Sequence, residues 1–159
     1  MGLVRIDHVG VAVADLDAAI AHYQRVFGMR CVHQETNQEQ GVREAMLAVG
    51  DGPDAGYLQL LAPLTPESPI ARFLDRHGPG VQQVAFTVTD VTAAAAELRA
   101  RGARVLYPEP RPGTAGSRIN FVHPKDAGGV LVELVEPGRP ATGPTTAPTD
   151  HTGRPPANG

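Results

Sequence analysis

The sequence has few cysteines, few aromatic residues and little net charge. Its 159 residues contain one cysteine, Cys31, which excludes a disulfide bond within the chain. The formal net charge of −3 gives no electrostatic reason to expect nucleic acid or an anionic membrane as a partner. There is also no apolar run long enough to span a bilayer and no charged-then-apolar leader. These absences together predict a cytoplasmic protein that binds neither nucleic acid nor membrane.

The composition separates a main body from a terminal segment. Hydrophobic residues make up 42% of the chain and charged residues 19%, as in ordinary soluble proteins. Residues 138–159 consist largely of Pro, Gly, Thr and Ala and cannot bury enough apolar surface to offset their ordering entropy. We therefore expect a single domain over residues 1–137 and a disordered tail over residues 138–159.

The body contains two copies of one module. The first copy occupies about residues 3–62 and the second about residues 81–136, with a linker at 63–80. His8 aligns with Gln83 at an offset of 75 residues, and the same or nearly the same offset relates further pairs along the whole body. These pairs are Asp15 and Asp90, Gly28 and Gly102, and Gln59 and Glu133.

Each module has the predicted order of one strand, one helix and three strands. An alternating strand over 3–13 or 81–88 is followed by Asp15 or Asp90, which caps a helix with an apolar face. Two tandem β-α-β-β-β modules are an α+β fold. The remaining strands are expected at 30–36, 42–49, 56–62, 104–107, 117–123 and 129–135, and a short linker helix at 68–77.

Four polar residues occupy equivalent places in the apolar strands. Strand alternation directs His8 and Gln83 away from the helices, beside small residues that leave room for a ligand. Gln59 and Glu133 are a second symmetric pair, so the four are expected to meet where the modules join. Histidine, glutamine and glutamate can all ligate a divalent ion. From the residues alone, a metal site and a hydrogen-bonded polar cluster remain equally open.

Several stretches resemble a known family. They are IDHVGVAVADLDAAIAHYQRVFG, EQGVREAMLAVG, YLQLLAP, GPGVQQVAF and GSRINFVHPKDAGGVLVELVEP. They resemble the vicinal oxygen chelate superfamily, also called the glyoxalase/bleomycin resistance/dioxygenase superfamily, and within it the methylmalonyl-CoA epimerase family. The resemblance implies that the paired modules form a curved mixed sheet around one cleft. It also implies an isomerase that interconverts (R)- and (S)-methylmalonyl-CoA, or a close 2-alkylmalonyl-CoA, by metal-assisted 1,1-proton transfer.

The resemblance assigns roles to individual residues. The family's metal ligands correspond to His8, Gln59 and Glu133, and Gln83 stands where the family usually has histidine. Cobalt is the expected ion, with manganese, nickel, zinc or magnesium as alternatives. The family's two catalytic bases correspond to Glu44 and Glu133. The expected partners are an acyl-CoA thioester as substrate and a second copy of the chain in a homodimer.

Three polar residues of the second module are candidates for contacts with the substrate. Ser117, Arg118 and Lys125 lie near the HPKD turn and could contact the substrate's carboxylate or CoA phosphates, or be ordinary surface residues. One alternative function is another enzyme of the superfamily, such as a lyase or a glyoxalase-like isomerase. The other is a metal-poor protein that binds or sequesters a ligand, an alternative that the amide of Gln83 supports.

Overall fold

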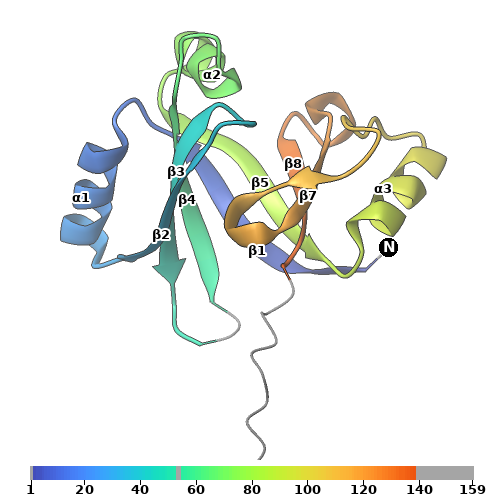
Figure 1. The fold of residues 1–159 in the computed structure, drawn as a ribbon, viewed down its shortest axis with the longest axis horizontal. Coiled ribbons are helices and arrows are strands. Elements are labelled where there is room, and N and C mark those ends of the chain that lie inside the picture. Colours follow the sequence, from blue (N-terminus) through green and yellow to red (C-terminus); the bar gives the residue numbers. More distant parts are fainter. Residues whose placement is uncertain (1, 53–54, 139–159) are drawn as a thin grey trace, which may run out of the picture.

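A computed structural model describes residues 2–52 and 55–138. They form one mixed eight-stranded sheet that curls into a half-barrel, with helices on its outer side (Figure 1). The first module comprises β1 (Leu3–Ala12), α1 (Leu16–Phe27), β2 (Arg30–Asn37), β3 (Val42–Val49) and β4 (Gly56–Pro63). The linker forms α2 (Pro69–His77). The second module comprises β5 (Gly80–Val88), α3 (Val91–Ala100), β6 (Arg111–Pro112), η1 (Thr114–Gly116), β7 (Arg118–Val122), η2 (Pro124–Asp126) and β8 (Leu131–Glu136).

The order of the strands shows how the two modules join. The order across the sheet is β2-β3-β4-β1-β5-β8-β7-β6. In each module the first strand pairs in parallel with the last, β1 with β4 and β5 with β8. The modules meet where β1 and β5 pair antiparallel, with Gly10 opposite Gln83. This arrangement confirms the predicted α+β fold of paired modules.

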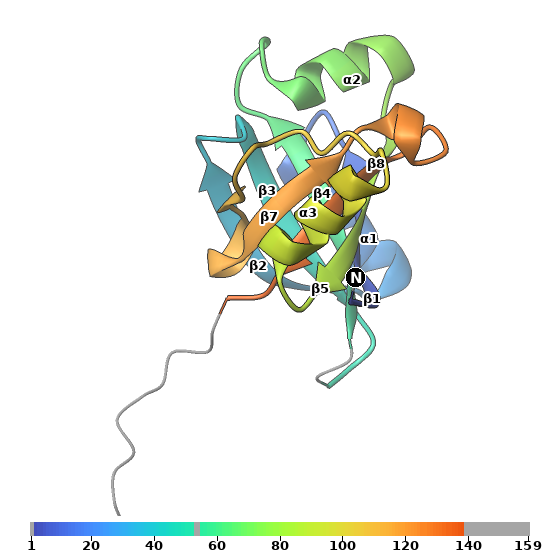
Figure 2. The ribbon, with the colours of Figure 1, turned by 90° about the vertical axis from the view of Figure 1, so that its right-hand side faces the viewer.

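The two module helices form as their capping residues predict. The carboxylate of Asp15 accepts a hydrogen bond from the backbone amide of Ala18 at 3.0 Å, and Asp90 caps α3 in the same way. Leu16 and Ile20 of α1 are buried against strand residues of the first module, and burying such a side chain contributes about 1.5–3 kcal/mol. Figure 2 shows α3 in the same role, covering the outer face of β7 and β8.

One predicted strand is wrong. Residues 104–107 do not form a strand; Val105 makes only an isolated bridge to Val122. The edge strand of the second module is instead the two-residue β6. Proline supplies no backbone N–H for a strand ladder, and Pro108 and Pro110, which directly follow residues 104–107, prevent a ladder from continuing beyond them.

Glycines in the left-handed conformation end both module helices: Gly28 follows α1 directly, and Gly102 follows Arg101, the C-cap of α3. The tail predicted at 138–159 lies, from residue 139 onward, outside the described residues. In the residues that the structure does describe, no helix is both long enough and apolar enough to cross a membrane.

Candidate active site

Four polar side chains converge at the centre of the concave face. His8 Nε2 lies 3.0 Å from Oε2 of Glu133. The amide nitrogen of Gln83 donates to the same Oε2 at 2.7 Å and to Oε1 of Gln59 at 3.2 Å. At most 6% of the surface of each residue is exposed. The structure thus brings together the four residues that the module repeat had paired.

The convergence follows from the strand order. His8 lies on β1, Gln59 on β4, Gln83 on β5 and Glu133 on β8. These strands are consecutive in the sheet, in the order β4-β1-β5-β8. Alternation along each strand places the polar side chain on the inner face, and the curl of the sheet turns the four side chains toward one another.

A buried carboxylate orients His8. Nδ1 of His8 lies 2.9 Å from Oδ1 of Asp7, and the other oxygen of Asp7 accepts a hydrogen bond of 2.7 Å from the hydroxyl of Thr87. Burial alone would lower the pKa of His8, but the hydrogen bonds to Asp7 and Glu133 outweigh it and raise the pKa to about 9. Asp7 therefore fixes the ring so that Nε2 faces Glu133.

Glu44 lies beside this cluster on β3 and is buried. Its Oε2 accepts a hydrogen bond of 2.9 Å from the amide of Gln59, and its Oε1 accepts one of 2.6 Å from the hydroxyl of Thr114. Burial raises the pKa of the Glu44 carboxyl to about 7; Thr114 opposes this shift, whereas the nearby carboxylates of Glu35 and Glu133 add to it. A carboxyl with such a pKa can both accept and release a proton near neutral pH.

Thr114 is a site residue that sequence reasoning missed. It lies in η1, a turn of the second module that reaches the inner strands of the first module, as the orange segment between the two halves of the sheet shows (Figure 1). The next residue, Ala115, donates its backbone N–H to Glu35 at 3.3 Å and has a φ of 53°. In the sequence only the glycines around this turn, Gly113 and Gly116, indicated an unusual backbone, and no pattern predicted that Thr114 would contact Glu44.

Two cavities flank the polar cluster. A cavity of about 180 Å³ is lined by Glu44, Gln59 and Gln83 together with apolar side chains. A second cavity, of about 340 Å³, is lined by His8 and other residues from both modules. Glu133 and Thr114 line both cavities, so the polar cluster separates two spaces within one concave face.

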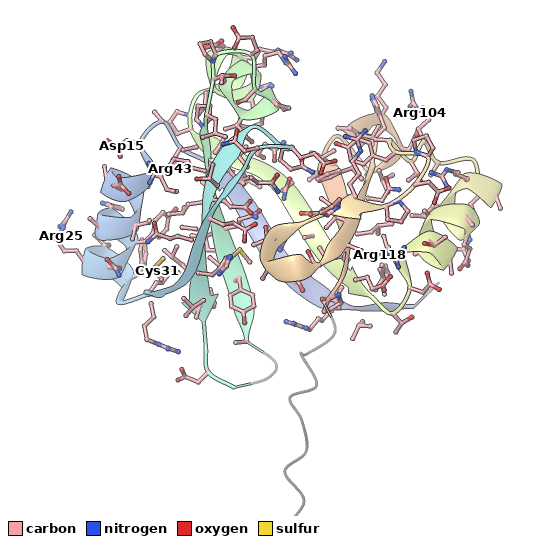
Figure 3. All side chains as sticks on the ribbon, in the orientation of Figure 1. Asp15, Arg25, Cys31, Arg43, Arg104 and Arg118 are labelled. Carbon is pink, nitrogen blue, oxygen red and sulfur yellow. The ribbon has the colours of Figure 1, made fainter. Side chains whose placement is uncertain are left out.

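The three predicted substrate contacts do not lie together. Ser117 is buried and lines the larger cavity. Arg118 lies on the α3 side of the sheet (Figure 3), where it pairs with Glu136 and donates to Thr92. Lys125 lies in η2 and is exposed. Among the described residues, Arg118 and Lys125 line neither cavity.

The donor set at the centre fits a divalent ion. Two of the proposed ligand atoms, Nε2 of His8 and Oε2 of Glu133, lie 3.0 Å apart. Neighbouring ligands of an octahedral ion with bonds of about 2.1 Å are about 3.0 Å apart. Within residues 2–52 and 55–138, no three His, Cys, Asp or Glu side chains are grouped to hold an ion, so an ion here would need the two amide oxygens as well as His8 and Glu133.

Comparisons with known proteins agree on the family. A model of the Glyoxalase/Bleomycin resistance protein/Dioxygenase superfamily matches residues 7–121. The crystal structure of methylmalonyl-CoA epimerase from Mycobacterium tuberculosis is 56% identical, with a TM-score of 0.81 over 86% of this chain and 89% of that chain. A variant of the Streptomyces coelicolor methylmalonyl-CoA epimerase in complex with 2-nitronate-propionyl-CoA is 51% identical, with a TM-score of 0.83 over 86% and 99%.

A curated bacterial relative is similar over nearly its whole length. The ethylmalonyl-CoA/methylmalonyl-CoA epimerase of Cereibacter sphaeroides is 37% identical over 132 residues, which cover 82% of this chain and 96% of the relative. The curved sheet of two modules and the buried polar cluster agree with these similarities. The chain belongs to the glyoxalase/bleomycin resistance/dioxygenase superfamily, the vicinal oxygen chelate proteins, and within it to the methylmalonyl-CoA epimerase family.

Proposed function

We propose that this chain is an epimerase that interconverts the (R) and (S) forms of methylmalonyl-CoA, or of a close 2-alkylmalonyl-CoA, by 1,1-proton transfer. One observation carries the proposal: Glu44 and Glu133 come from different modules and line the same cavity. Three strands, β4, β1 and β5, separate their strands in the curled sheet. Two carboxylates that reach one cavity from two sides suit a reaction that needs a base on each face of a carbon atom.

Each of the two carboxylates carries out one proton transfer at C2. The hydrogen on C2 of a 2-alkylmalonyl thioester is acidic because its removal gives an enolate. One of Glu44 and Glu133 takes that proton from one face of C2, and the other returns a proton to the opposite face. The pKa of Glu44, raised to about 7 by burial, suits a group that alternates between base and acid. Thr114 and Gln59 hold its two oxygens in place.

His8, Gln59, Gln83 and Glu133 are proposed to hold a divalent ion, cobalt or a similar first-row metal. Such an ion, when bound, supplies positive charge that lowers the free energy of the enolate. The burial of the donor set and the 3.0 Å separation of Nε2 of His8 from Oε2 of Glu133 support this assignment. In this assignment Glu133 serves both as ligand and as base.

The substrate contacts are proposed by chemistry and position. Ser117 is buried at the larger cavity, where its hydroxyl is available to a carboxylate of the substrate. Lys125 and Arg118 are basic residues near the HPKD turn and are proposed for the CoA phosphates, although Arg118 would have to leave Glu136. One relative is named for both ethylmalonyl-CoA and methylmalonyl-CoA, so assays with each thioester are needed to identify the preferred acyl group.

Deuterium exchange at C2 tests the proposed reaction. The protein is incubated with (R)- or (S)-methylmalonyl-CoA in D₂O, and loss of the C2 proton and formation of the other enantiomer are followed by NMR. We expect both processes to occur with protein and to be absent without it. Binding of the thioester without exchange would instead identify a ligand-sequestering protein.

Removal of the ion tests the proposed metal site separately. We expect purified protein to contain about one divalent ion per chain, and chelation to abolish epimerisation until the ion is restored. His8→Ala should abolish ion binding, whereas His22→Ala, in an exposed position on α1, should not. If the purified protein holds no ion and its activity does not change with chelators, the proposed metal site is wrong. The roles of Glu44 and Glu133 would then be tested without it.

A homodimer is proposed as the assembled form. Three large apolar side chains in the first half of β1 are exposed in the single chain: Leu3, Val4 and Ile6. Exposed apolar residues close together in one strand suit a surface that a second subunit covers. Light scattering coupled to gel filtration measures the mass directly, and a monomer at micromolar concentration would contradict the proposal.

A further inference from the structure

The amide nitrogen of Gln83 lies among two acceptor oxygens and one ring nitrogen of His8. It is 2.7 Å from Oε2 of Glu133, 3.2 Å from Oε1 of Gln59 and 3.4 Å from Nε2 of His8. Gln83 is buried, and the oxygens of Glu133 and Gln59 accept hydrogen bonds from its NH₂ group. The NH₂ group thus fills the point at which the other three proposed ligands converge.

A glutamine amide can face this point with its nitrogen or with its oxygen, but the neighbours accept only one of these orientations. If the oxygen faced inward, it would lie about where the nitrogen is, close to the oxygens of Glu133 and Gln59 with no proton between them. The proton on Nε2 of His8 is already shared with Glu133, so a cation among these oxygens would be needed to remove the repulsion. The inward nitrogen and a bound ion therefore exclude each other.

Gln59 has the opposite orientation. Its amide nitrogen points away from the centre and donates to Glu44 at 2.9 Å and to Thr114 at 3.2 Å. Its oxygen therefore faces the centre before any ion arrives. The two glutamines are alike in chemistry and burial, but only Gln59 is already oriented as a ligand.

We propose that Gln83 competes with the metal ion for the centre of the site. Without the ion, the NH₂ group of Gln83 occupies the centre; an ion can enter only when these hydrogen bonds break and the amide rotates to present its oxygen. Gln83 thereby lowers the affinity of the site, and the chain should exchange its ion readily. This inference rests on the metal site of the proposed function and adds a regulatory role for one of its residues.

Ion affinities of substituted proteins test the competition. Zn²⁺ and Co²⁺ are titrated into chelator-stripped wild type, Gln83→Ala, Gln83→Met and Gln59→Ala, with binding followed by calorimetry. Gln83→Ala removes the competing donor and lets water replace the amide oxygen, so we expect the affinity to rise about tenfold, the scale of one to two hydrogen bonds. Gln83→Met keeps the side-chain volume and should raise the ion affinity in the same way, so the test remains possible if Gln83→Ala folds poorly. Gln59→Ala, the matched control, removes an oriented ligand and should weaken binding.

The outcomes separate this inference from the proposed function. If both Gln83 variants and Gln59→Ala bind the ion more weakly than wild type, Gln83 is an ordinary ligand: the inference fails and the metal site stands. If wild type and all variants bind neither ion, the metal site itself is wrong and the inference falls with it. Epimerase activity is measured independently by C2 exchange, so neither result depends on turnover.

Discussion

The hydroxyl of Thr114 donates a hydrogen bond of 2.6 Å to Oε1 of Glu44, across 70 residues of sequence and between the two modules. The same hydroxyl accepts a hydrogen bond of 3.2 Å from the amide of Gln59, which in turn binds the other oxygen of Glu44. The carboxylate is therefore fixed at both oxygens. A base must be held within a fraction of an ångström of its proton to act efficiently, so this contact should matter for rate.

Thr114→Val should lower kcat about tenfold. Valine keeps the shape of threonine but cannot hydrogen-bond, so Glu44 loses one of its two anchors, and a hydrogen bond to a charged group contributes about 1.5–3 kcal/mol. Thr114→Ser retains the hydroxyl and should restore most of the rate. Steady-state epimerisation gives kcat and KM for each variant; equal activity of the valine and serine variants would show that the hydroxyl does not position the base.

Glu44→Gln should lower the rate of epimerisation by about 10²-fold or more, the scale of general base catalysis. Glutamine keeps the shape of the side chain but cannot accept a proton. Because Glu44 is outside the proposed ligand set, the ion should still bind, and deuterium should still enter from the face that Glu133 serves. The exposed Glu109→Gln is the matched control. Epimerisation at the wild-type rate would contradict the assignment of Glu44 as a base.

Gly10→Ala should destabilise the fold because the added methyl group would collide with the side chain of Gln83. A Cβ atom at residue 10 would lie 2.5 Å from Cγ of Gln83 and 3.2 Å from Cδ1 of Leu61. Overpacking of this kind typically costs about 1–3 kcal/mol of the free energy of unfolding. Gly80→Ala, where a Cβ atom meets nothing within 4 Å, is the control in the neighbouring strand. Urea denaturation compares the two; equal stability would mean that the sheet shifts to make room.

The ion pair of Asp126 and Arg104 should stabilise the fold only above acidic pH. Two side-chain hydrogen bonds and one backbone hydrogen bond from Arg104 lower the pKa of Asp126 in the folded protein. Because the folded pKa lies below the unfolded value of about 3.9, the stabilisation is present above that value and is lost as the pH falls through the folded pKa.

Melting temperatures between pH 7 and pH 3 test this prediction. Asp126→Asn should melt below wild type at pH 7, and the difference should shrink as the solution becomes more acidic than about pH 4. Asp75→Asn, at an exposed position of α2, should show no comparable difference. A gap between Asp126→Asn and wild type that stays constant with pH would show that the carboxylate's charge contributes nothing.

The sequence by itself determined the repeat and the residues that it pairs. A nearly constant offset relates His8 to Gln83 and Gln59 to Glu133, and strand alternation with a period of two places all four on one face. Asp15 and the apolar period after it determined α1 in the same way. These features depend on local periodicity and short-range hydrogen bonds, and both can be read directly from the order of residues in the sequence.

The tertiary structure decided which side chains from distant segments of the chain contact one another. Thr114 reaches Glu44 because η1 crosses from one module to the other, and Arg118 lies on the α3 side because Glu136 and Thr92 bind it there. The orientation of the Gln83 amide depends on acceptor oxygens from two other strands, β4 and β8. The physical reason is that nitrogen and oxygen of an amide differ little in shape, so only the donors and acceptors that surround it in the folded chain choose between them.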